Sequence, residues 1–157
     1  MLQRLVDWAF DRVDIGADNP AGPLMSRWRI MSTRAFGVKV HHIRRADADR
    51  WLHDHPWSFV SIRVKGTYTE MLAQRGPCGF RSTRFARNRR ISRIRYDTLH
   101  QVTRTPPAGV WTIVVNGPRR HQWGIQDVTG PYRSTADTFE ALAHDQGARR
   151  SNAKAAA

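Results

Sequence analysis

Cysteine and long apolar runs are nearly absent from this sequence. The one cysteine, Cys78, excludes an internal disulfide, which fits a reducing cytoplasmic compartment. No apolar run approaches the roughly 18 residues that a transmembrane helix needs, so we expect no membrane span. The apolar N-terminal segment carries Asp7 and Asp11, so we expect no signal peptide. Together these absences favour a cytoplasmic protein without disulfides.

Negative charge is scarce as well. The chain has 13 acidic residues against 26 lysines and arginines, which gives a net charge of +13, and nearly all of the positive residues are arginine. Such a charge is typical of proteins that bind nucleic acid or anionic ligands. Because the arginines are spread along the whole chain, the base composition of the coding DNA explains the charge equally well. Nucleic-acid binding stays open, although no helix-turn-helix, zinc-finger or RNA-recognition signature supports it.

The length predicts one domain. With 157 residues, 40% of them hydrophobic, the chain can bury a modest single core. We expect this domain to cover residues 1–145, with a barrel core at about 36–125. Helical spacing of apolar residues predicts a short N-terminal helix over 2–13 and a C-terminal helix over 135–144. We expect residues 146–157 to form a disordered tail.

Between these ends the pattern is that of β-strands separated by turns rich in glycine and proline. Residues 36–43 alternate between two faces, and residues 110–116, V-W-T-I-V-V-N, form the strongest predicted strand because β-branched residues fill it. The segment at 105–109, T-P-P-A-G, predicts a clear turn. Several short strands with such turns predict a mainly-β sandwich or barrel.

Two histidines stand at the centre of this pattern, in the stretch W-L-H-D-H-P-W of residues 51–57. Because residues i and i+2 of a strand point to the same face, His53 and His55 can reach one point. A third histidine, His100, lies in a distant apolar stretch. Two histidines on one face and a distant third form the pattern with which a β-barrel binds a metal ion. Asp54 should point away from this face and fix the local structure.

The dipeptide Lys65-Gly66 predicts a β-hairpin between the strands on either side of it. If these two residues form the whole loop, Glu70 and Tyr68 share a face with Phe59, Ser61 and Arg63 of the preceding strand. A change of one residue in the turn would reverse this orientation. The facing pairs would be Ser61 with Glu70 and Arg63 with Tyr68.

Within the mainly-β class, the histidine pattern resembles the cupin superfamily. The first cupin motif has H-x-H and a glycine about eleven residues after the second histidine, where this chain has His53, His55 and Gly66. The second motif has a turn followed by a histidine, and His100 matches it without the proline or glycine of the motif. The segments L-H-D-H-P-W, G-x-Y-x-E and N-G-P-R-R-x-x-W-G look like a group of small bacterial and phage cupin proteins of unassigned function. The resemblance implies a double-stranded β-helix, or jelly-roll barrel.

The chain departs from the cupin pattern at one metal ligand. The cupin glutamate would fall at Phe59 or Val60, and neither side chain binds metal. The resemblance leaves two solutions: a site of three histidines, as in cysteine-dioxygenase-like cupins, or a carboxylate supplied by Glu70 from the neighbouring strand. Glu70 is also a candidate partner for a ligand histidine and a candidate general base.

The resemblance implies a metal-dependent enzyme with a small-molecule substrate. Histidine-rich sites with open positions suit Fe(II) and oxygen chemistry, so a dioxygenase is the first prediction and Fe(II) the favoured metal. Imidazole also binds Zn, Ni, Mn and Cu, which leaves the metal open. A sugar isomerase or epimerase is the next enzyme class. The resemblance also implies a homodimer.

Three further residues are candidate substrate contacts. Arg63 offers a cation and Tyr68 a phenol, and this pair suits a carboxylate or phosphate group. Tyr68 is also a candidate catalytic residue beside Glu70, and Trp51 can shield the site. Two non-enzymatic alternatives stay open, namely a cupin module that binds a ligand or has a structural role, and a basic nucleic-acid-binding protein on a cupin scaffold.

Overall fold

The computed structural model describes residues 10–17, 21–46, 52–75, 80–87, 89–126 and 132–134. All regular secondary structure in these residues is β-strand, and none of them forms a helix with the length and hydropathy to cross a membrane. The strands are β1 (Asp11–Ile15), β2 (Met25–Ser32), β3 (Gly37–Ile43), β4 (Leu52–His53), β5 (Phe59–Lys65), β6 (Thr69–Arg75), β7 (Phe80–Arg87), β8 (Ile91–Ile94), β9 (Thr98–Arg104), β10 (Val110–Asn116), β11 (Gly124–Gln126) and β12 (Tyr132–Ser134).

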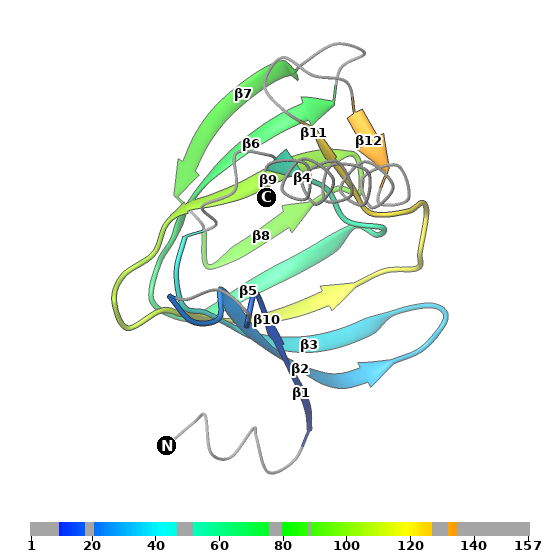
Figure 1. The fold of residues 1–157 in the computed structure, drawn as a ribbon. Helices are drawn as coiled ribbons and strands as arrows, with labels where there is room; N and C mark the ends of the chain where they lie inside the picture. The colour runs from blue at the N-terminus through cyan, green and yellow to red at the C-terminus, as the bar shows by residue number, and fades with distance from the viewer. Residues whose placement is uncertain are drawn as a thin grey trace, which may run out of the picture.

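The strands form two six-stranded antiparallel sheets, seen as two layers in Figure 1. Sheet A has the order β1-β2-β3-β10-β5-β8, and sheet B has the order β12-β11-β4-β9-β6-β7. From β7 to β11 the chain alternates between the two sheets, and strands far apart in sequence lie side by side, such as β3 beside β10. The prediction of a mainly-β protein is confirmed.

Strand β10, the strongest predicted strand, lies in the interior of sheet A. It pairs with β3 on one side and with β5 on the other. Most of its residues are buried, including Val110, Trp111 and Thr112 in succession. A strand in the interior of a sheet favours β-branched and aromatic residues, which is the composition of V-W-T-I-V-V-N.

The predicted hairpin at Lys65-Gly66 does not form. Strand β5 pairs with β10 and β8 in sheet A, whereas β6 pairs with β7 and β9 in sheet B, so the dipeptide carries the chain from one sheet to the other. Gly66 has a φ of 77°, and a Cβ there would lie 2.6 Å from the carbonyl oxygen of Gly109. The glycine therefore serves a tight crossing packed against another loop. The facing partners are Val114 for Ser61, Thr112 for Arg63 and Val102 for Glu70.

The predicted N-terminal helix over residues 2–13 is wrong where the structure describes it. Residues 11–13 belong to β1, whose Asp11 and Val13 pair with Arg29 and Arg27 of β2. Pairing with a neighbouring strand outweighs a short helical spacing of apolar residues, because the edge of β2 offers its backbone hydrogen bonds. Residues 2–9, the predicted helix over 135–144 and the predicted tail lie outside the described residues.

The apolar core between the sheets is small. Phe59 and Val114 of one sheet meet Leu72 of the other, together with Ile94. The rest of the facing surfaces carries histidine, lysine, arginine and threonine side chains, because the same alternation that turns Phe59 and Val114 inward also turns in Ser61 and Thr112. The interior between the two sheets therefore has an apolar part around Phe59 and a polar part around Thr112.

Candidate metal centre

Three histidines from two strands and the segment that follows one of them come together inside the sandwich. His53, at the end of β4, pairs directly with His100 of β9, and His55 follows two residues after His53. One nitrogen of each imidazole lies within 4.8 Å of the others, an arrangement that can hold a metal ion. The Nε2 atoms of His55 and His100 are 2.8 Å apart. The structure thus joins the two sequence motifs at one point.

His53 and His55 are held as neutral imidazoles. Burial, with a contribution from the charge of His100, lowers the pKa of His53 to about 3. Burial also lowers the pKa of His55 well below its ordinary value, and His100 and His53 add to this effect. A neutral imidazole carries the lone pair that a metal ligand needs, so these ligands are ready at neutral pH.

The short contact between His55 and His100 fits a metal ion. Two lone pairs directed at each other at 2.8 Å repel unless a proton or a cation lies between them. Two imidazole nitrogens bound at ~2.1 Å and about 90° to one metal would be roughly 3.0 Å apart. The donor set and its spacing therefore agree with a bound divalent metal.

Glu70 contacts the outer nitrogen of His100 rather than the point where the three histidines meet. The side chain is 2% exposed, and its Oε2 lies 3.4 Å from Nδ1 of His100. A proton on Nδ1 directed at this carboxylate leaves the Nε2 lone pair of His100 free to face His55. At the position of the expected cupin glutamate, Phe59 presents its ring to His55 with the ring centroids 4.9 Å apart.

The other predicted site residues have different surroundings. Tyr68 is 6% exposed, and burial together with the charge of Glu70 raises its pKa, so it is a neutral phenol. Arg63 donates from Nη1 to the carbonyl oxygen of Gly66 and to the hydroxyl of Thr67, which occupies that nitrogen at the sheet crossing. Trp51 lies outside the described residues.

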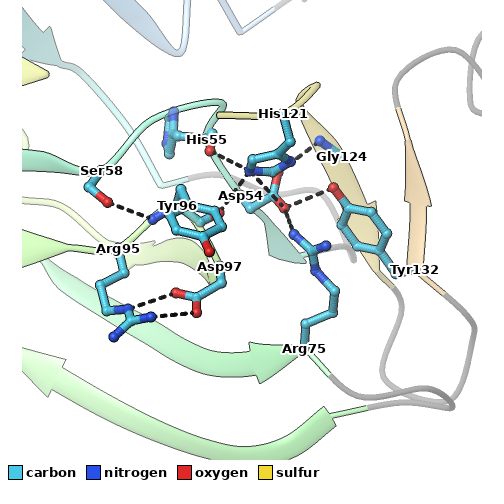
Figure 2. Close-up of polar contacts among 10 residues, drawn as sticks. All are labelled: Asp54, His55, Ser58, Arg75, Arg95, Tyr96, Asp97, His121, Gly124 and Tyr132. Atoms are coloured by element: carbon cyan, nitrogen blue, oxygen red, sulfur yellow. Dashed lines mark hydrogen bonds and ion pairs between the residues drawn. The ribbon is translucent and has the colours of Figure 1, made fainter. Parts of the chain in front are cut away.

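Asp54 lies between the two histidines of the H-D-H segment but faces the opposite side of the strand, and it is fully buried. Figure 2 shows it at the centre of a polar cluster. Its Oδ1 accepts a hydrogen bond of 2.9 Å from the backbone N–H of Gly124, and its Oδ2 accepts one of 2.9 Å from the Tyr132 hydroxyl. Arg75 donates to the same Oδ2. Burial raises the pKa of Asp54, against the opposing effects of Tyr132 and Arg75.

His121 adds a link from this cluster to the histidines. Its Nε2 lies 2.9 Å from the carbonyl oxygen of His55 and 3.0 Å from that of Tyr96, so it carries the proton and donates to these acceptors. The same nitrogen is 3.9 Å from the Asp54 carboxylate. No pattern in the sequence assigns a role to His121, Arg75 or Tyr132. His121 lies in the segment N-G-P-R-R-x-x-W-G, and this segment contains no recognised ligand pattern.

Lys39 and His41, on β3, face the same interior from sheet A. Lys39 donates 2.8 Å to Oδ1 of Asn116 and lies 4.0 Å above the ring of Trp57. Burial and the nearby charges of Arg27 and Arg29 lower its pKa to about 8. Burial and the same kind of positive neighbours lower the pKa of His41 to about 3. The site therefore has metal-ligand nitrogens on one side, and the cation of Lys39 with the neutral imidazole of His41 on the other.

Solved structures of similar shape identify the fold. The Streptomyces protein PAC13, solved with uridine, has a TM-score of 0.53 at 8% sequence identity, with 80% of this chain and 89% of that chain covered. A cupin-2 domain protein of Rhodospirillum rubrum, Rru_A2000, has a TM-score of 0.51 at 14% identity, with 85% and 82% covered. Oxalate decarboxylase of Lactobacillus farciminis, solved with formate, has a TM-score of 0.50 at 11% identity, with 80% and 33% covered. No protein-family model and no curated protein matches the sequence.

Proposed function

This chain has the cupin fold, and from that premise we propose that it is a metal-dependent enzyme that oxidises a small anionic substrate with molecular oxygen. One observation carries the proposal: three histidines whose ligand atoms converge within 4.8 Å. Three imidazoles leave coordination positions open, and such sites suit Fe(II), which is the metal we favour.

The protein groups around the site have distinct parts in this proposal. His53, His55 and His100 hold the metal, and Glu70 keeps the ring of His100 in the orientation that exposes its Nε2. A divalent metal bound there supplies Lewis acidity and, as Fe(II), the capacity for oxygen chemistry. Tyr68, a buried neutral phenol near the charge of Glu70, is our candidate donor of a hydrogen bond to the substrate.

The charges favour an anionic substrate. Three imidazole ligands bring no negative charge to a divalent metal, so the single carboxylate of Glu70 behind His100 leaves an excess of positive charge. Lys39 adds a cation whose contacts are to Asn116 and the ring of Trp57. A carboxylate or phosphate that enters this interior offsets the charge on both sides. Among the solved structures of similar fold, the oxalate decarboxylase holds formate, a small carboxylate.

Metal analysis of protein purified without a histidine tag tests the proposal. We expect close to one metal per chain, and we expect His55→Ala to lose it. His42→Gln is the matched control, because His42 lies on the opposite face of β3, with its ring centroid 4.3 Å from that of Trp111. The control should keep the metal. A correctly folded protein that binds no Fe(II), Mn(II) or Zn(II) would refute the proposal. Oxygen consumption by the Fe(II)-loaded protein with small carboxylates then tests the reaction class.

A second function is favoured by one observation at the site. Phe59, an apolar ring, occupies the position of the expected cupin glutamate beside His55. A protein that carries out no redox reaction can tolerate the loss of the glutamate ligand. The alternative is therefore a cupin module that binds a metal and a ligand but does not convert the ligand. Stoichiometric metal together with anion binding, but no oxygen consumption across carboxylate substrates, would favour this alternative.

A further inference from the structure

The inner face of sheet A carries a row of polar side chains across four strands. Thr112 of β10 pairs with His41 of β3 on one side and with Arg63 of β5 on the other. Arg27 of β2 pairs with His41 and extends the row. Directly paired residues project from the same face of a sheet, and Thr112 lies two residues before the core residue Val114. These four side chains are called the interior polar row.

Three members of the row have a buried polar atom without a hydrogen-bond partner. The atoms are Nε2 of His41, Oγ1 of Thr112 and Nε of Arg63. Thr112 is 1% exposed, so its hydroxyl is not solvated from outside. Buried polar atoms in folded proteins are nearly always paired with protein, water or ligand. Three unpaired atoms in adjacent positions therefore indicate a place where a polar molecule is bound.

The charges identify the kind of molecule. Arg63 donates to the Gly66 carbonyl oxygen and the Thr67 hydroxyl, and Lys39 contacts Asn116 and the Trp57 ring, so both cations have only neutral partners. A partly buried cation is stabilised when an anion pairs with it, and a guanidinium, an ammonium and a hydroxyl together suit the oxygens of a carboxylate or phosphate.

The row is also close to the three histidines. Phe59, which lies on the same face of β5 as Arg63, has its ring centroid 4.9 Å from that of His55 and 6.0 Å from that of His100. A molecule bound by the row would thus lie between sheet A and the histidines of sheet B. The positions of the residues thus separate two roles: sheet B provides the metal ligands, and sheet A provides the groups that would contact an anion.

We infer that the interior polar row binds an oxyanion group, a carboxylate or a phosphate, of the molecule on which the protein acts. The inference rests on the proposed function for the identity of that molecule as a substrate, whereas the binding itself needs only the row. Thr112 and the Nε of Arg63 donate to the anion, and His41 donates in the tautomer that carries its proton on Nε2. Arg27 and Lys39 supply the remaining positive charge.

Thermal unfolding of chelator-treated, metal-free protein with inorganic phosphate, and separately with acetate, tests the inference at an ionic strength held constant with chloride. We expect a saturable rise in Tm with one or both anions, and the more effective anion identifies the group. Thr112→Val removes only the unpaired hydroxyl, so without anion its Tm should equal or exceed that of the wild type. In the presence of anion, Thr112→Val and Arg63→Lys should each weaken binding at least about tenfold.

Thr103→Val is the matched control, because the Thr103 hydroxyl already donates 3.1 Å to the carbonyl oxygen of Thr69. It should lower Tm and leave the anion response unchanged. No anion response in the wild type, or an equal response in Thr112→Val and Arg63→Lys, would overturn the inference, since the row would then hold water alone or the anion would bind elsewhere. A response that depends on the row in a protein that never binds metal supports the inference while the proposed function fails. Bound metal without an anion response that depends on the row would overturn the inference while leaving the proposed function intact.

Discussion

At the scale of single residues, the contact between Glu70 and His100 decides what the only interior glutamate of β6 does. The carboxylate meets Nδ1 of His100, while Nε2 of the same ring meets His55. A carboxylate in this place fixes the tautomer and orientation of a ligand histidine and raises its basicity. It therefore affects metal affinity without binding the metal.

Glu70→Gln tests this assignment. The amide retains the size of the side chain but not its charge, so we expect metal affinity to fall by roughly 10- to 100-fold with a stoichiometry still near one. Competition with a chromogenic chelator measures the affinity. Asp97→Asn, which changes an exposed carboxylate paired with Arg95 in the same way, should leave affinity unchanged. Complete loss of metal in Glu70→Gln would instead make Glu70 a ligand, and unchanged affinity would leave it without a part in the site.

At the scale of elements, β4 is the short strand that must hold two of the three histidines. It has two residues, and its ladder contacts are to β11 and to His100 of β9. The buried Asp54 compensates for this short ladder, because its carboxylate ties the segment to β11 through Gly124, to β12 through Tyr132 and to β6 through Arg75. One face of the H-D-H segment is thus anchored, and the other carries His53 and His55.

Tyr132→Phe should weaken this anchor by a measurable amount. It removes one hydrogen bond to a buried carboxylate, and we expect the free energy of unfolding to fall by about 1.5–3 kcal/mol. Denaturant unfolding measures the loss, and hydrogen exchange should show weaker protection of the β11 amides. The combination with Asp54→Asn should be strongly non-additive, because both changes remove the same contact. Additive effects would show that the two side chains act independently.

At the scale of the whole molecule, buried neutral histidines from both sheets link stability to pH. His41 of sheet A and His53 of sheet B each have a pKa lowered to about 3 by burial, and the pKa of His55 is lowered in the same direction. The unfolded chain takes up protons near pH 6.5, where the folded protein does not. Folding stability of the metal-free protein is therefore fully present above about pH 6.5 and falls as the pH drops from there toward 3.

His41→Gln should make this decline shallower. Each buried histidine contributes a slope of up to about 1.4 kcal/mol per pH unit within that window, and the variant lacks one of them. Urea unfolding of metal-free wild type and variant between pH 4 and pH 8 measures the slopes. The two proteins should differ by a constant amount above pH 7 and should converge on acidification. Parallel curves over the whole range would contradict the assignment of His41 as a buried neutral group.

The sequence by itself determined the features that depend on the two-residue period of a strand. Alternation predicted the β class and the strand at 110–116, and it placed His53 and His55 on one side with Asp54 on the other. The cupin resemblance, confirmed by the fold, added His100 as their distant partner. These features are local, or follow from a spacing that the fold preserves.

Only the tertiary structure decided which strands are neighbours. A glycine with positive φ at position 66 suits a hairpin and a crossing between sheets equally well, so Lys65-Gly66 could not reveal that β5 and β6 lie in opposite sheets. The contact of Glu70 with the outer nitrogen of His100 depends on that choice. The Asp54 anchor and the interior polar row join residues dozens of positions apart. Contacts of this kind are set by sheet pairing, and no local pattern of side chains encodes the partner.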